Sequence, residues 1–517
     1  MLFLGIDLGT QGARGIVCDE RGKVFAQGTC NFGSLNTSCK EGQYEQAPIM
    51  WWNAVKQVIT ECMDSLLQTG RKPSQIRAIT VDGTSGTIVL LDKEKRPLRD
   101  ALLYNDMRAA AQAEKIHRYA GELEKKMGYL FNASFALPKV LWIKEEEPYV
   151  YEKARHMVHQ SDYIVGMLTG EYGVTDYSNA LKSGFDLKEE EWPKLLDVLE
   201  LDRMIFPSVI PPGQGIGTIT KRAAVEFGLS TDTVVAAGAT DGYVSAISTG
   251  AVRRGDWASV IGTTMVLKGV TEKLLCDAGG SSYSHKLPSG DWMFGGASNI
   301  GGRCLNDSFD KEQFEMWNRG VMDVIPTKVI SYPLHGRGER FPFLDPEAKA
   351  FVLGDISDPQ IHYAALMEGV AYAERFALEH MQHCGAAVGN EIYTTGGACS
   401  SSEWLQIRAS VLDRVLKVPE HTGAAIGCAI LAASASCYGS LTEAAEHMVS
   451  YRKIIEPVYR LTAAYDQLYQ RAFQAYKERY HATVRYCCAF TALAEERIQP
   501  GNDPTFYIQN SYQLKQE

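Results

Sequence analysis

Short apolar runs alternate with helical patterns through the first third of the chain. Apolar runs of strand length predict a hairpin and then further strands, and apolar spacing of the helical kind predicts a helix between them. The expected strands are 2–6, 13–18, 24–28, 76–81 and 87–91, the helix is 50–68, and a turn is expected at 93–96. Strands that alternate with helices predict an α/β layered fold.

The opening design of an apolar strand, a Gly-Thr turn and a second apolar strand returns in the middle of the chain, around residue 262. This repetition predicts two related halves. The proline-containing stretch 206–217 is interpreted as a loop or linker. The remaining expected elements are a mostly helical region at 110–172, a strand and helix within 234–251, helices at 361–382, 403–412 and 461–480, a strand at 392–395, and a buried small-residue helix at 424–433.

A chain of 517 residues is too long for one hydrophobic core, so two large domains are expected. The formal net charge of −10 argues against a nucleic-acid partner, whose binding surface would be basic. Twelve cysteines without a C-x-x-C pair are typical of reduced thiols in the cytoplasm. The longest apolar runs are shorter than a membrane span. We expect no membrane partner, and a homodimer is the candidate assembly.

The first apolar run ends in an acid, Asp7, and a Gly-Thr-x-Gly turn follows it. Asp7 either caps an ordinary hairpin or belongs to a phosphate-binding turn. In the second interpretation Gly9 and Gly12 let backbone N–H groups approach an anion, Thr10 adds a hydroxyl, and Asp7 holds a metal ion. The turn at Gly262 and Thr263 has the same two interpretations. Two such turns in one chain favour a nucleotide clasped between two halves.

The stretch "YTTGGACSSSEWLQIRA" combines a strand, a Gly-Gly turn and a helix that begins after a serine cluster. Gly396 and Gly397 would let a purine or ribose lie on the backbone. Trp404 either packs against the base or belongs to the core. A walker-type phosphate loop, G-x-x-x-x-G-K-[ST], does not occur in the sequence.

Asp241, in "ATDG", follows a strand of small residues. It is either the N-cap of the next helix or a general base that takes a proton from a substrate hydroxyl. Polar residues at other strand ends suit a polyhydroxylated ligand, although each alone is also typical of turns: Thr84, Ser85, Asn105, Asp106 and Arg108. His380 and His383 have no further ligand in register, and we interpret them as a surface helix face.

Five motifs together resemble the FGGY carbohydrate kinases. "GIDLGTQGARGIVCD" and "VIGTTMVLK" resemble the two phosphate motifs of that family, "YTTGGACSSSEWLQIRA" its adenosine motif, and "ATDG" the position of its catalytic aspartate. "GRGERFPFLDPEAKAFVLG" resembles a stretch of the family's C-terminal domain. The motifs occur in the family's order, and the resemblance covers roughly residues 1–480.

This resemblance implies two actin-like, ribonuclease H-like ATPase domains with a central cleft that closes over ATP, Mg²⁺ and a sugar. The expected division is a sugar-binding domain at 1–247, an ATP-binding domain at 248–485 and a tail of unknown role at 486–517. The resemblance places Asp7 at the metal, and Asp241 as the base. The sugar side is expected to include Asp7, Gln11, Gly12, Ser85 and Asp241. The ATP side is expected to include Thr10, Gly262, Thr263, Gly396, Gly397, Ser401 and Trp404.

The stretch "DGTSG" of this chain stands where xylulokinases have a "G-Q-M-H-G" pattern, and this difference indicates the branch of the family. "DGTSGT", "LLYND" and "GGASNIGG" look more like D-ribulose kinases, so we expect phosphorylation of D-ribulose on its terminal hydroxyl. D-xylulose, or another polyol or sugar acid, is the alternative. Gln11 stands where a serine is usual, and it could tune substrate choice. Two other classes stay open: an ATPase of the same fold that acts as a regulatory or binding module, and an actin-type filament protein.

Overall fold

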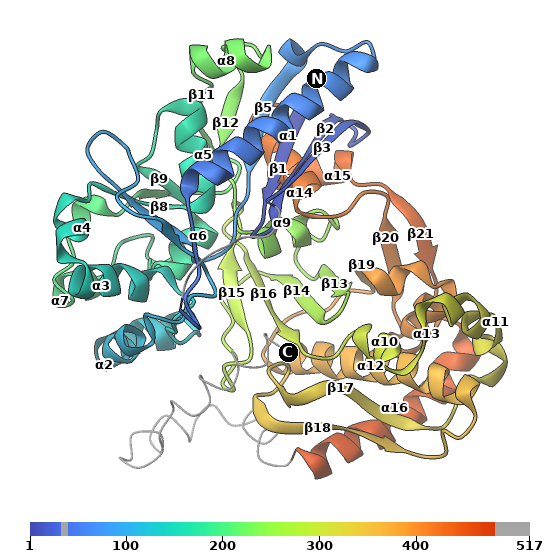
Figure 1. The fold of residues 1–517 in the computed structure, drawn as a ribbon. Coiled ribbons are helices and arrows are strands. Elements are labelled where there is room, and N and C mark those ends of the chain that lie inside the picture. The colour runs from blue at the N-terminus through green and yellow to red at the C-terminus, as the bar shows by residue number, and fades with distance from the viewer. Residues whose placement is uncertain (33–39, 481–517) are drawn as a thin grey trace. The chain divides into compact units, whose positions relative to one another are not determined.

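The computed structural model describes residues 1–32 and 40–480, which form two compact units (Figure 1). The first unit comprises Met1–Val252, His285–Asp291 and His421–Ser450, and the second contains Arg253–Ser284, Trp292–Glu420 and the described chain from Tyr451 on. The main boundary lies near the expected one between 247 and 248. The units differ from the expected continuous domains because two later segments return to the first unit. The expected tail at 486–517 lies outside the described residues.

The first unit begins with the strands and helix that the opening pattern predicted. Its strands are β1 (Leu2–Leu8), β2 (Gly12–Asp19), β3 (Val24–Asn31), β4 (Glu45–Gln46), β5 (Ile76–Val81), β6 (Ile88–Leu91), β7 (Ala101–Leu102), β8 (His156–His159), β9 (Val174–Asp176), β10 (Ser208–Ile210), β11 (Gly215–Thr218) and β12 (Val234–Ala236). Its helices are α1 (Pro48–Gln68), α2 (Ala110–Met127), α3 (Ala136–Glu146), α4 (Pro148–Lys153), α5 (Gln160–Thr169), α6 (Tyr177–Lys182), α7 (Leu195–Val198), α8 (Lys221–Phe227), α9 (Asp241–Ile247), α14 (Ala424–Ser434) and α15 (Leu441–Met448).

Three parallel strands of the first unit end at the same edge of its main sheet. The strand order is β11-β12-β5-β1-β2-β3. β1 is antiparallel to β2 and parallel to β5, with Ile6 opposite Val81. β12 is also parallel to β5. The residues that follow β1, β5 and β12 are therefore brought to one edge, where ligands bind in open α/β sheets.

The small-residue run predicted as a buried helix is α14, which packs against β1 in the first unit (Figure 1). Its residues Ala424 to Ala433 are all buried. A Cβ atom added to Gly5 of β1 would lie 2.0 Å from the carbonyl oxygen of Ala425. Glycine at position 5 thus permits a close approach of helix and strand, and only small side chains fit on either side.

The second unit repeats the design of the first. Its strands are β13 (Trp257–Ile261), β14 (Met265–Thr271), β16 (Trp292–Ser298), β17 (Ile330–Glu339), β18 (Asp345–Leu353), β19 (Glu391–Thr395), β20 (Val415–Pro419) and β21 (Tyr451–Ile455), and β15 (Tyr283–Lys286) begins in it. Its helices are α10 (Arg303–Ser308), α11 (Phe314–Val324), α12 (Pro359–His383), α13 (Ser402–Leu412) and α16 (Tyr459–Arg479). β13 is antiparallel to β14 and parallel to β19, which confirms the predicted repetition.

The region predicted to be mostly helical contains α2, α3, α4 and α5, together with the short strand β8, which pairs antiparallel with β6. One stretch differs from the sequence-based expectations. The proline-containing stretch expected as a loop contains β10 and the start of β11, because each pairs with another strand of the first unit. Both strands are short, and their partners lie elsewhere in the chain. In the described part of the chain, no helix has the length and apolar character needed to cross a bilayer.

Candidate active site

Three aspartates gather at the edge where the parallel strands of the first unit end. Asp7 is the penultimate residue of β1, Asp82 follows β5 directly, and Asp241 is the first residue of α9 after β12. The backbone N–H of Asp241 donates to the carbonyl of Gly83 at 3.0 Å. This bond fixes the start of α9 against the turn that follows β5. The two predicted acids, Asp7 and Asp241, are therefore brought to one edge of the sheet.

Asp82 is the buried member of this group and was not among the predicted site residues. Its side chain is fully buried, and it accepts hydrogen bonds from the N–H of Leu8 at 3.2 Å and from Sγ of Cys428 at 3.3 Å. It is also hydrogen bonded to Asp7. An acid directly after a buried strand is a signal that the sequence does contain. The pairing of β1 with β5 places this acid beside Asp7, which the sequence alone does not show.

The charges of Asp7 and Asp241 disfavour the ionisation of Asp82. Burial, and then the charges of Asp7 and Asp241, raise the pKa of Asp82 well above its usual value. Burial also raises the pKa of Asp7, against the opposing effect of Arg14, whose guanidinium lies 3.9 Å away. A divalent cation would relieve this repulsion, and carboxylate oxygens are the ligands that Mg²⁺ prefers. The donor set therefore fits Mg²⁺ at Asp7.

The raised pKa of Asp82 makes the stability of the protein depend on pH. Asp82 binds its proton more tightly in the folded state, so its contribution is fully present below an ordinary aspartate pKa and is lost as pH rises through the raised value. Across that interval the wild type is expected to lose about 1.4 kcal/mol per pH unit relative to Asp82→Asn, which cannot ionise. Urea unfolding of both proteins from pH 4.5 to 8, without Mg²⁺, measures this difference.

The matched control for this prediction is Asp64→Asn, which changes an exposed carboxylate on α1 of the same unit. Its unfolding free energy should follow that of the wild type at every pH. Parallel curves for Asp82→Asn and the wild type would contradict the assignment of a strained, protonated carboxyl to Asp82.

The predicted phosphate turn between β1 and β2 is a tight, closed turn. The N–H of Gly9 donates to the carbonyl of Gly12 at 2.9 Å, and the side chain of Gln46 donates to the carbonyl of Thr10 at 2.9 Å. A Cβ atom on Gly12 would lie 2.1 Å from the carbonyl oxygen of Cys30, so this position requires glycine. The side chain of Gln11 is exposed at the tip of the turn. The turn has the form that the phosphate interpretation needs.

Asp241 is exposed, and it is not the N-cap of its helix. The N-cap of α9 is Thr240, and Asp241 occupies the first helical position, where its Oδ1 accepts from the N–H of Gly242 at 2.7 Å. The N-cap interpretation of Asp241 is thus wrong. Burial, and then the charge of Asp241, raise the pKa of Tyr104, which places that phenol near the carboxylate. An exposed carboxylate beside the buried Asp82 is suited to accept a proton from a bound hydroxyl.

The polar residues predicted for a polyhydroxylated ligand divide into two groups. Thr84 is satisfied by Thr87 and Gln160, while Asp106 and Arg108 form an ion pair at 2.8 Å. These three support the local structure. Oγ of Ser85 and Oδ1 of Asn105 are buried polar atoms without a hydrogen-bond partner among the described residues. Such atoms are costly unless a ligand or water satisfies them, so they are the strongest candidates for contact with a sugar.

The second unit brings three glycine turns together at the edge where β13 and β19 end. The N–H of Gly302 donates to the carbonyl of Gly262 at 2.7 Å, and a Cβ on Gly301 would lie 2.5 Å from the carbonyl oxygen of Thr263. Gly396 has a φ of +96°, and a Cβ there would lie 2.4 Å from the carbonyl oxygen of Ile261. Sequence reasoning singled out the turns at 262 and 396. The glycines at 301 and 302 were quoted only as part of a substrate-branch motif.

Open space lies over two of the predicted nucleotide residues. A Cβ atom on Gly262 or on Gly397 would meet no atom within 4 Å. Thr263 and Gly397 are both exposed. Bare backbone beside open space suits the approach of phosphate groups and of a flat ligand.

Ser401 and Trp404 support the group of glycine turns around Gly262, Gly302 and Gly396, which we call the nucleotide shelf. Oγ of Ser401 caps α13 by accepting from the N–H of Trp404 at 3.0 Å, and it donates to Oδ1 of Asn318 at 3.1 Å. Trp404 is 4% exposed, and its indole N–H donates to the carbonyl of Met367 at 3.2 Å. This burial favours the core alternative for Trp404 over stacking on a base. The indole lies 3.8 Å from the position of a Cβ on Gly302, so it positions that turn.

His380 does not lie on a surface helix face, and that part of the prediction for the histidine pair is wrong. His383 is exposed, whereas His380 is buried. The Nε2 atom of His380 lies 3.5 Å from Oδ1 of Asp277, in the connection between β14 and β15. The prediction considered only ligands at helical spacing from His380, whereas Asp277 lies in a distant part of the chain.

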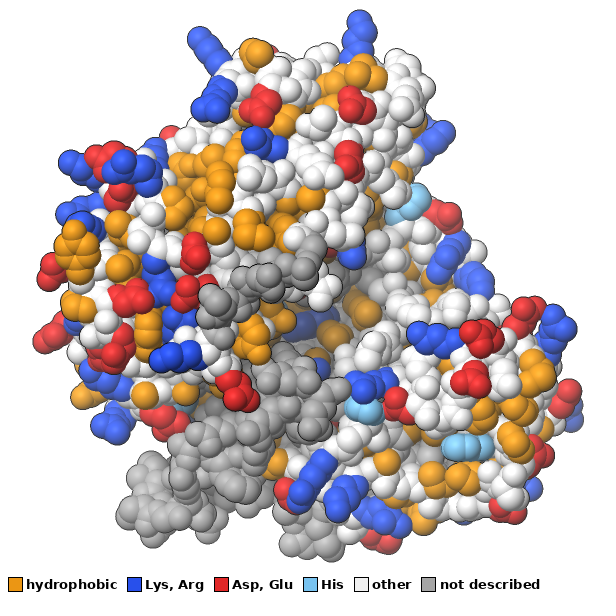
Figure 2. Space-filling model, viewed as in Figure 1, with side chains coloured by type: hydrophobic (Ala, Val, Ile, Leu, Met, Phe, Trp, Pro, Cys, Tyr) orange, Lys and Arg blue, Asp and Glu red, His pale blue; other side chains and the backbone are white. Residues whose placement is uncertain are grey.

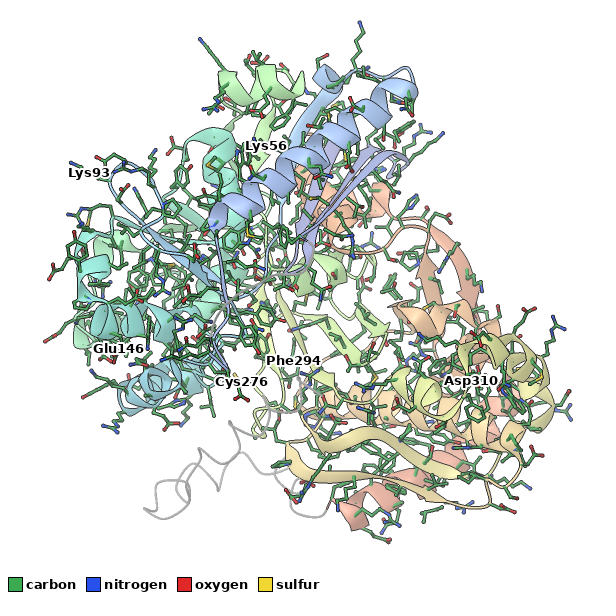
Figure 3. All side chains as sticks on the ribbon, in the orientation of Figure 1. Lys56, Lys93, Glu146, Cys276, Phe294 and Asp310 are labelled. Atoms are coloured by element: carbon green, nitrogen blue, oxygen red, sulfur yellow. The ribbon has the colours of Figure 1, made fainter. Side chains whose placement is uncertain are left out.

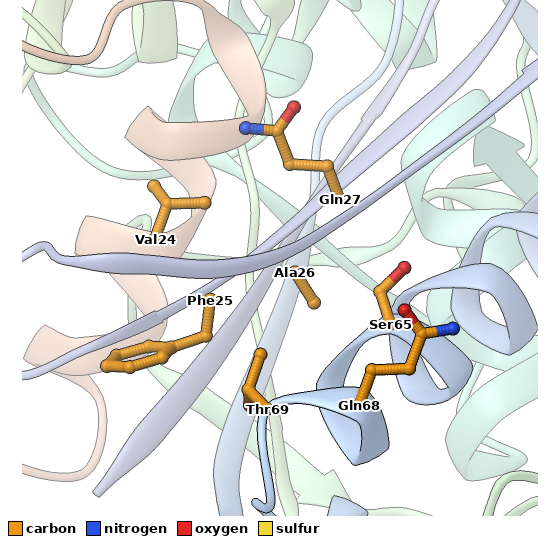
Figure 4. Close-up of a pocket in the computed structure, with 7 residues that line it drawn as sticks. All are labelled: Val24, Phe25, Ala26, Gln27, Ser65, Gln68 and Thr69. Atoms are coloured by element: carbon orange, nitrogen blue, oxygen red, sulfur yellow. The ribbon is translucent and has the colours of Figure 1, made fainter.

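A separate pocket lies between the edge strand β3 and the C-terminal part of α1 in the first unit (Figure 4). Its lining residues are Val24, Phe25, Ala26, Gln27, Ser65, Gln68 and Thr69. None of them is a predicted site residue. Acidic and basic side chains are interspersed over the surface seen in Figure 2. We therefore retain the aspartate group, and not this pocket or a charged surface patch, as the candidate active site.

Comparisons with known proteins find carbohydrate kinases. The chain is 28% identical over 494 residues to a xylulose kinase of Bacillus subtilis, covering 93% of this chain and 97% of that one. It is 25% identical over 452 residues to a gluconokinase of the same organism, covering 83% and 86%. The crystal structure of a xylulose kinase from Rhodospirillum rubrum has a TM-score of 0.81 at 24% identity, covering 92% of this chain and 99% of that one. This likeness confirms the expected fold of two actin-like ATPase domains.

Two family models match nearly the whole of the described chain. Residues 2–248 match the N-terminal domain of the FGGY family of carbohydrate kinases, and residues 258–436 match its C-terminal domain. The match includes the three aspartates and the three glycine turns. The chain belongs to the FGGY family of carbohydrate kinases.

Proposed function

We propose that this ATP-dependent carbohydrate kinase phosphorylates the terminal hydroxyl of a ketopentose, D-ribulose, to give D-ribulose 5-phosphate. The observation that carries the reaction class is the group of three aspartates at the ends of β1, β5 and β12. The ketopentose assignment rests on "DGTSG", in which Thr84 and Ser85 stand where the xylulokinase pattern has Met and His. D-xylulose is the alternative, favoured by the relatives named xylulose kinase.

In the proposed reaction the first unit binds the sugar and the second binds the nucleotide. Asp241 accepts the proton of the terminal hydroxyl as the hydroxyl oxygen attacks the γ-phosphorus, and ADP leaves. Ser85 and Asn105 hold sugar hydroxyls through the two buried atoms that lack partners. The turn at Gly9–Gly12 contacts the transferred phosphoryl group. Asp7 would hold Mg²⁺, which would supply charge neutralisation for the phosphate oxygens.

Most of the rate acceleration in such a reaction comes from placement and from electrostatic stabilisation. The structure supports this division of labour, because Asp82 is buried and hydrogen bonded to Asp7. Asp82 thereby orients the carboxylate that is proposed to hold the metal. Its own burial leaves it no direct role toward the sugar, so we assign Asp82 as a positioning residue.

The experiment that tests the substrate is an ADP-release assay with D-ribulose, D-xylulose, L-ribulose, ribitol, erythritol, glycerol and gluconate. D-ribulose is expected to give the highest kcat/KM. A higher value for D-xylulose would transfer the assignment to the alternative and leave the kinase class intact. ATP hydrolysis at the same rate without any sugar would indicate a regulatory ATPase instead. Sedimentation of the same protein measures whether it is a homodimer, which is part of the proposal.

Ser85→Ala is expected to raise KM for the sugar about 3- to 10-fold, because it removes one neutral hydrogen bond worth about 0.5–1.5 kcal/mol. KM for ATP should stay unchanged, since Ser85 is not among the residues proposed to bind the nucleotide. Steady-state kinetics with each substrate varied in turn measure both constants. Ser134→Ala is the matched control: its hydroxyl already donates to Asn132, at 2.5 Å, within a local turn. An unchanged sugar KM in Ser85→Ala would remove Ser85 from the sugar site.

A further inference from the structure

A buried group of metal-binding residue types lies in the second unit, apart from the residues assigned to ATP. Asp277 comes from the connection between β14 and β15, His380 from the last turn of α12, and Cys384 is the C-cap of that helix. Asp277 and His380 are buried, and Cys384 is partly exposed. Each offers one donor atom, and the three atoms lie within 4.8 Å of one another. The kinase reaction proposed above uses none of them.

The contacts in this group converge on a single nitrogen. Nε2 of His380 lies 3.5 Å from Oδ1 of Asp277 and 3.7 Å from Sγ of Cys384. A relay that activates a thiol uses both ring nitrogens, one for the carboxylate and one for the sulfur. Here both partners approach the same nitrogen. The carboxylate oxygen and the sulfur thus lie beside the same nitrogen, and all three donor atoms lie within 4.8 Å of one another.

The two separations match the edges of a tetrahedral zinc site. Zinc bonds of about 2.0–2.1 Å to nitrogen, 2.0–2.2 Å to oxygen and 2.3 Å to sulfur give ligand separations of about 3.4 Å for N···O and 3.6 Å for N···S. The observed values are 3.5 Å and 3.7 Å. The two separations that involve His380 therefore suit zinc ligands.

Backbone hydrogen bonds hold the carboxylate of Asp277 in place. Oδ2 of Asp277 accepts from the N–H of Ser281 at 2.8 Å, and Oδ1 accepts from the N–H of Gly279 at 2.9 Å. Ligand-supporting hydrogen bonds of this kind are typical of metal sites.

The helix contributes in two ways. His380 and Cys384 are four residues apart, so they lie on one face of the last turn. The C-terminal end of a helix carries partial negative charge, which favours a cation there. Cys276, labelled in Figure 3, precedes Asp277 directly and is a second cysteine next to the group.

We propose that Asp277, His380 and Cys384 bind a Zn²⁺ ion with water in the fourth position. Binding replaces the thiol proton of Cys384, which is released to solvent, by a zinc–sulfur bond. The ion ties the loop after β14 to the end of α12, within the unit that carries the nucleotide shelf. The partly exposed side of Cys384 gives the ion and the water access.

The first test uses Co²⁺ as a spectroscopic probe on the full-length protein after removal of metals by chelation. The wild type is expected to bind one Co²⁺ per chain, with a thiolate-to-cobalt charge-transfer band, and Zn²⁺ is expected to displace it. Cys384→Ser should lose the band. Asp277→Asn and His380→Gln should weaken binding by more than the 10- to 100-fold typical of outer partners. His383→Gln, an exposed histidine of the same helix, is the matched control and should bind as the wild type does.

The second test needs no variant, so a folding defect cannot obscure it. Zn²⁺ is expected to slow the alkylation of Cys384 by iodoacetamide at least 10-fold in the wild type, as measured by peptide mass spectrometry. The alkylation of Cys437, which lies in the first unit, should not change. Equal alkylation of Cys384 with and without Zn²⁺ would overturn the proposal. A charge-transfer band that persists in Cys384→Ser would overturn it as well, because the cobalt would then be bound elsewhere.

Discussion

Asp241→Asn is expected to lower kcat about 10²- to 10⁴-fold, the scale on which loss of a general base slows proton transfer. The variant keeps an oxygen that can accept from the N–H of Gly242, the contact that Oδ1 makes at 2.7 Å. The start of α9 should therefore be preserved, and the KM values for sugar and ATP should change little. Initial-rate kinetics with saturating ATP and the preferred sugar measure the effect.

The matched control for this prediction is Asp232→Asn, an exposed aspartate in the loop before β12. It should retain the wild-type kcat, which shows that loss of one surface carboxylate does not slow the enzyme. Near-normal turnover in Asp241→Asn would exclude Asp241 as the base. A raised sugar KM at normal kcat would instead make it a binding residue.

The aspartate group shows what the sequence could predict and what it could not. Asp7 and Asp241 were recognisable because each stands beside glycines at the end of an apolar strand. Asp82 stands in an equivalent position, but its burial and its hydrogen bond to Asp7 depend on the register of β1 against β5. Strand register is a tertiary property, and a single sequence does not state it.

The residues predicted to bind the nucleotide also show which features a single sequence can and cannot predict. Gly262 and Gly396 were predicted from local patterns, since glycine turns after strands are local signals. Trp404 had two open interpretations, and its burial against Met367 is decided by packing between helices. His380 was misassigned because its partner, Asp277, is on a separate element. Contacts between elements distant in the chain are the part that local patterns leave undetermined.

The helix α13, which follows the turn at Gly396, contributes one partner of a buried ion pair. The motif "YTTGGACSSSEWLQIRA" contains this arginine but does not show its partner. Arg408 of α13 is fully buried and forms two hydrogen bonds with Glu374 of α12, both at 2.8 Å. It also donates to the hydroxyl of Ser259 in β13, at 3.1 Å. The three residues join β13, α12 and α13, and the turns after β13 and before α13 carry Gly262 and Gly396. The geometry of the shelf therefore depends on this pair.

Arg408→Met is expected to lower the free energy of unfolding by about 3–5 kcal/mol, because it leaves the Glu374 carboxylate buried without its partner. The double variant Arg408→Met/Glu374→Leu removes both charges and should recover most of that loss, since well-packed apolar residues can replace a buried pair. Arg319→Met is the matched control, because it breaks an exposed pair with Glu315 and should cost less than about 1 kcal/mol. Urea unfolding of the four proteins measures these values. A cost below about 1 kcal/mol for Arg408→Met would show that the pair does not hold the three elements together. KM for ATP is measured as well, at temperatures where the variant stays folded. The expected loss of stability together with a higher KM for ATP would link the buried pair to the glycine turns proposed to bind the nucleotide.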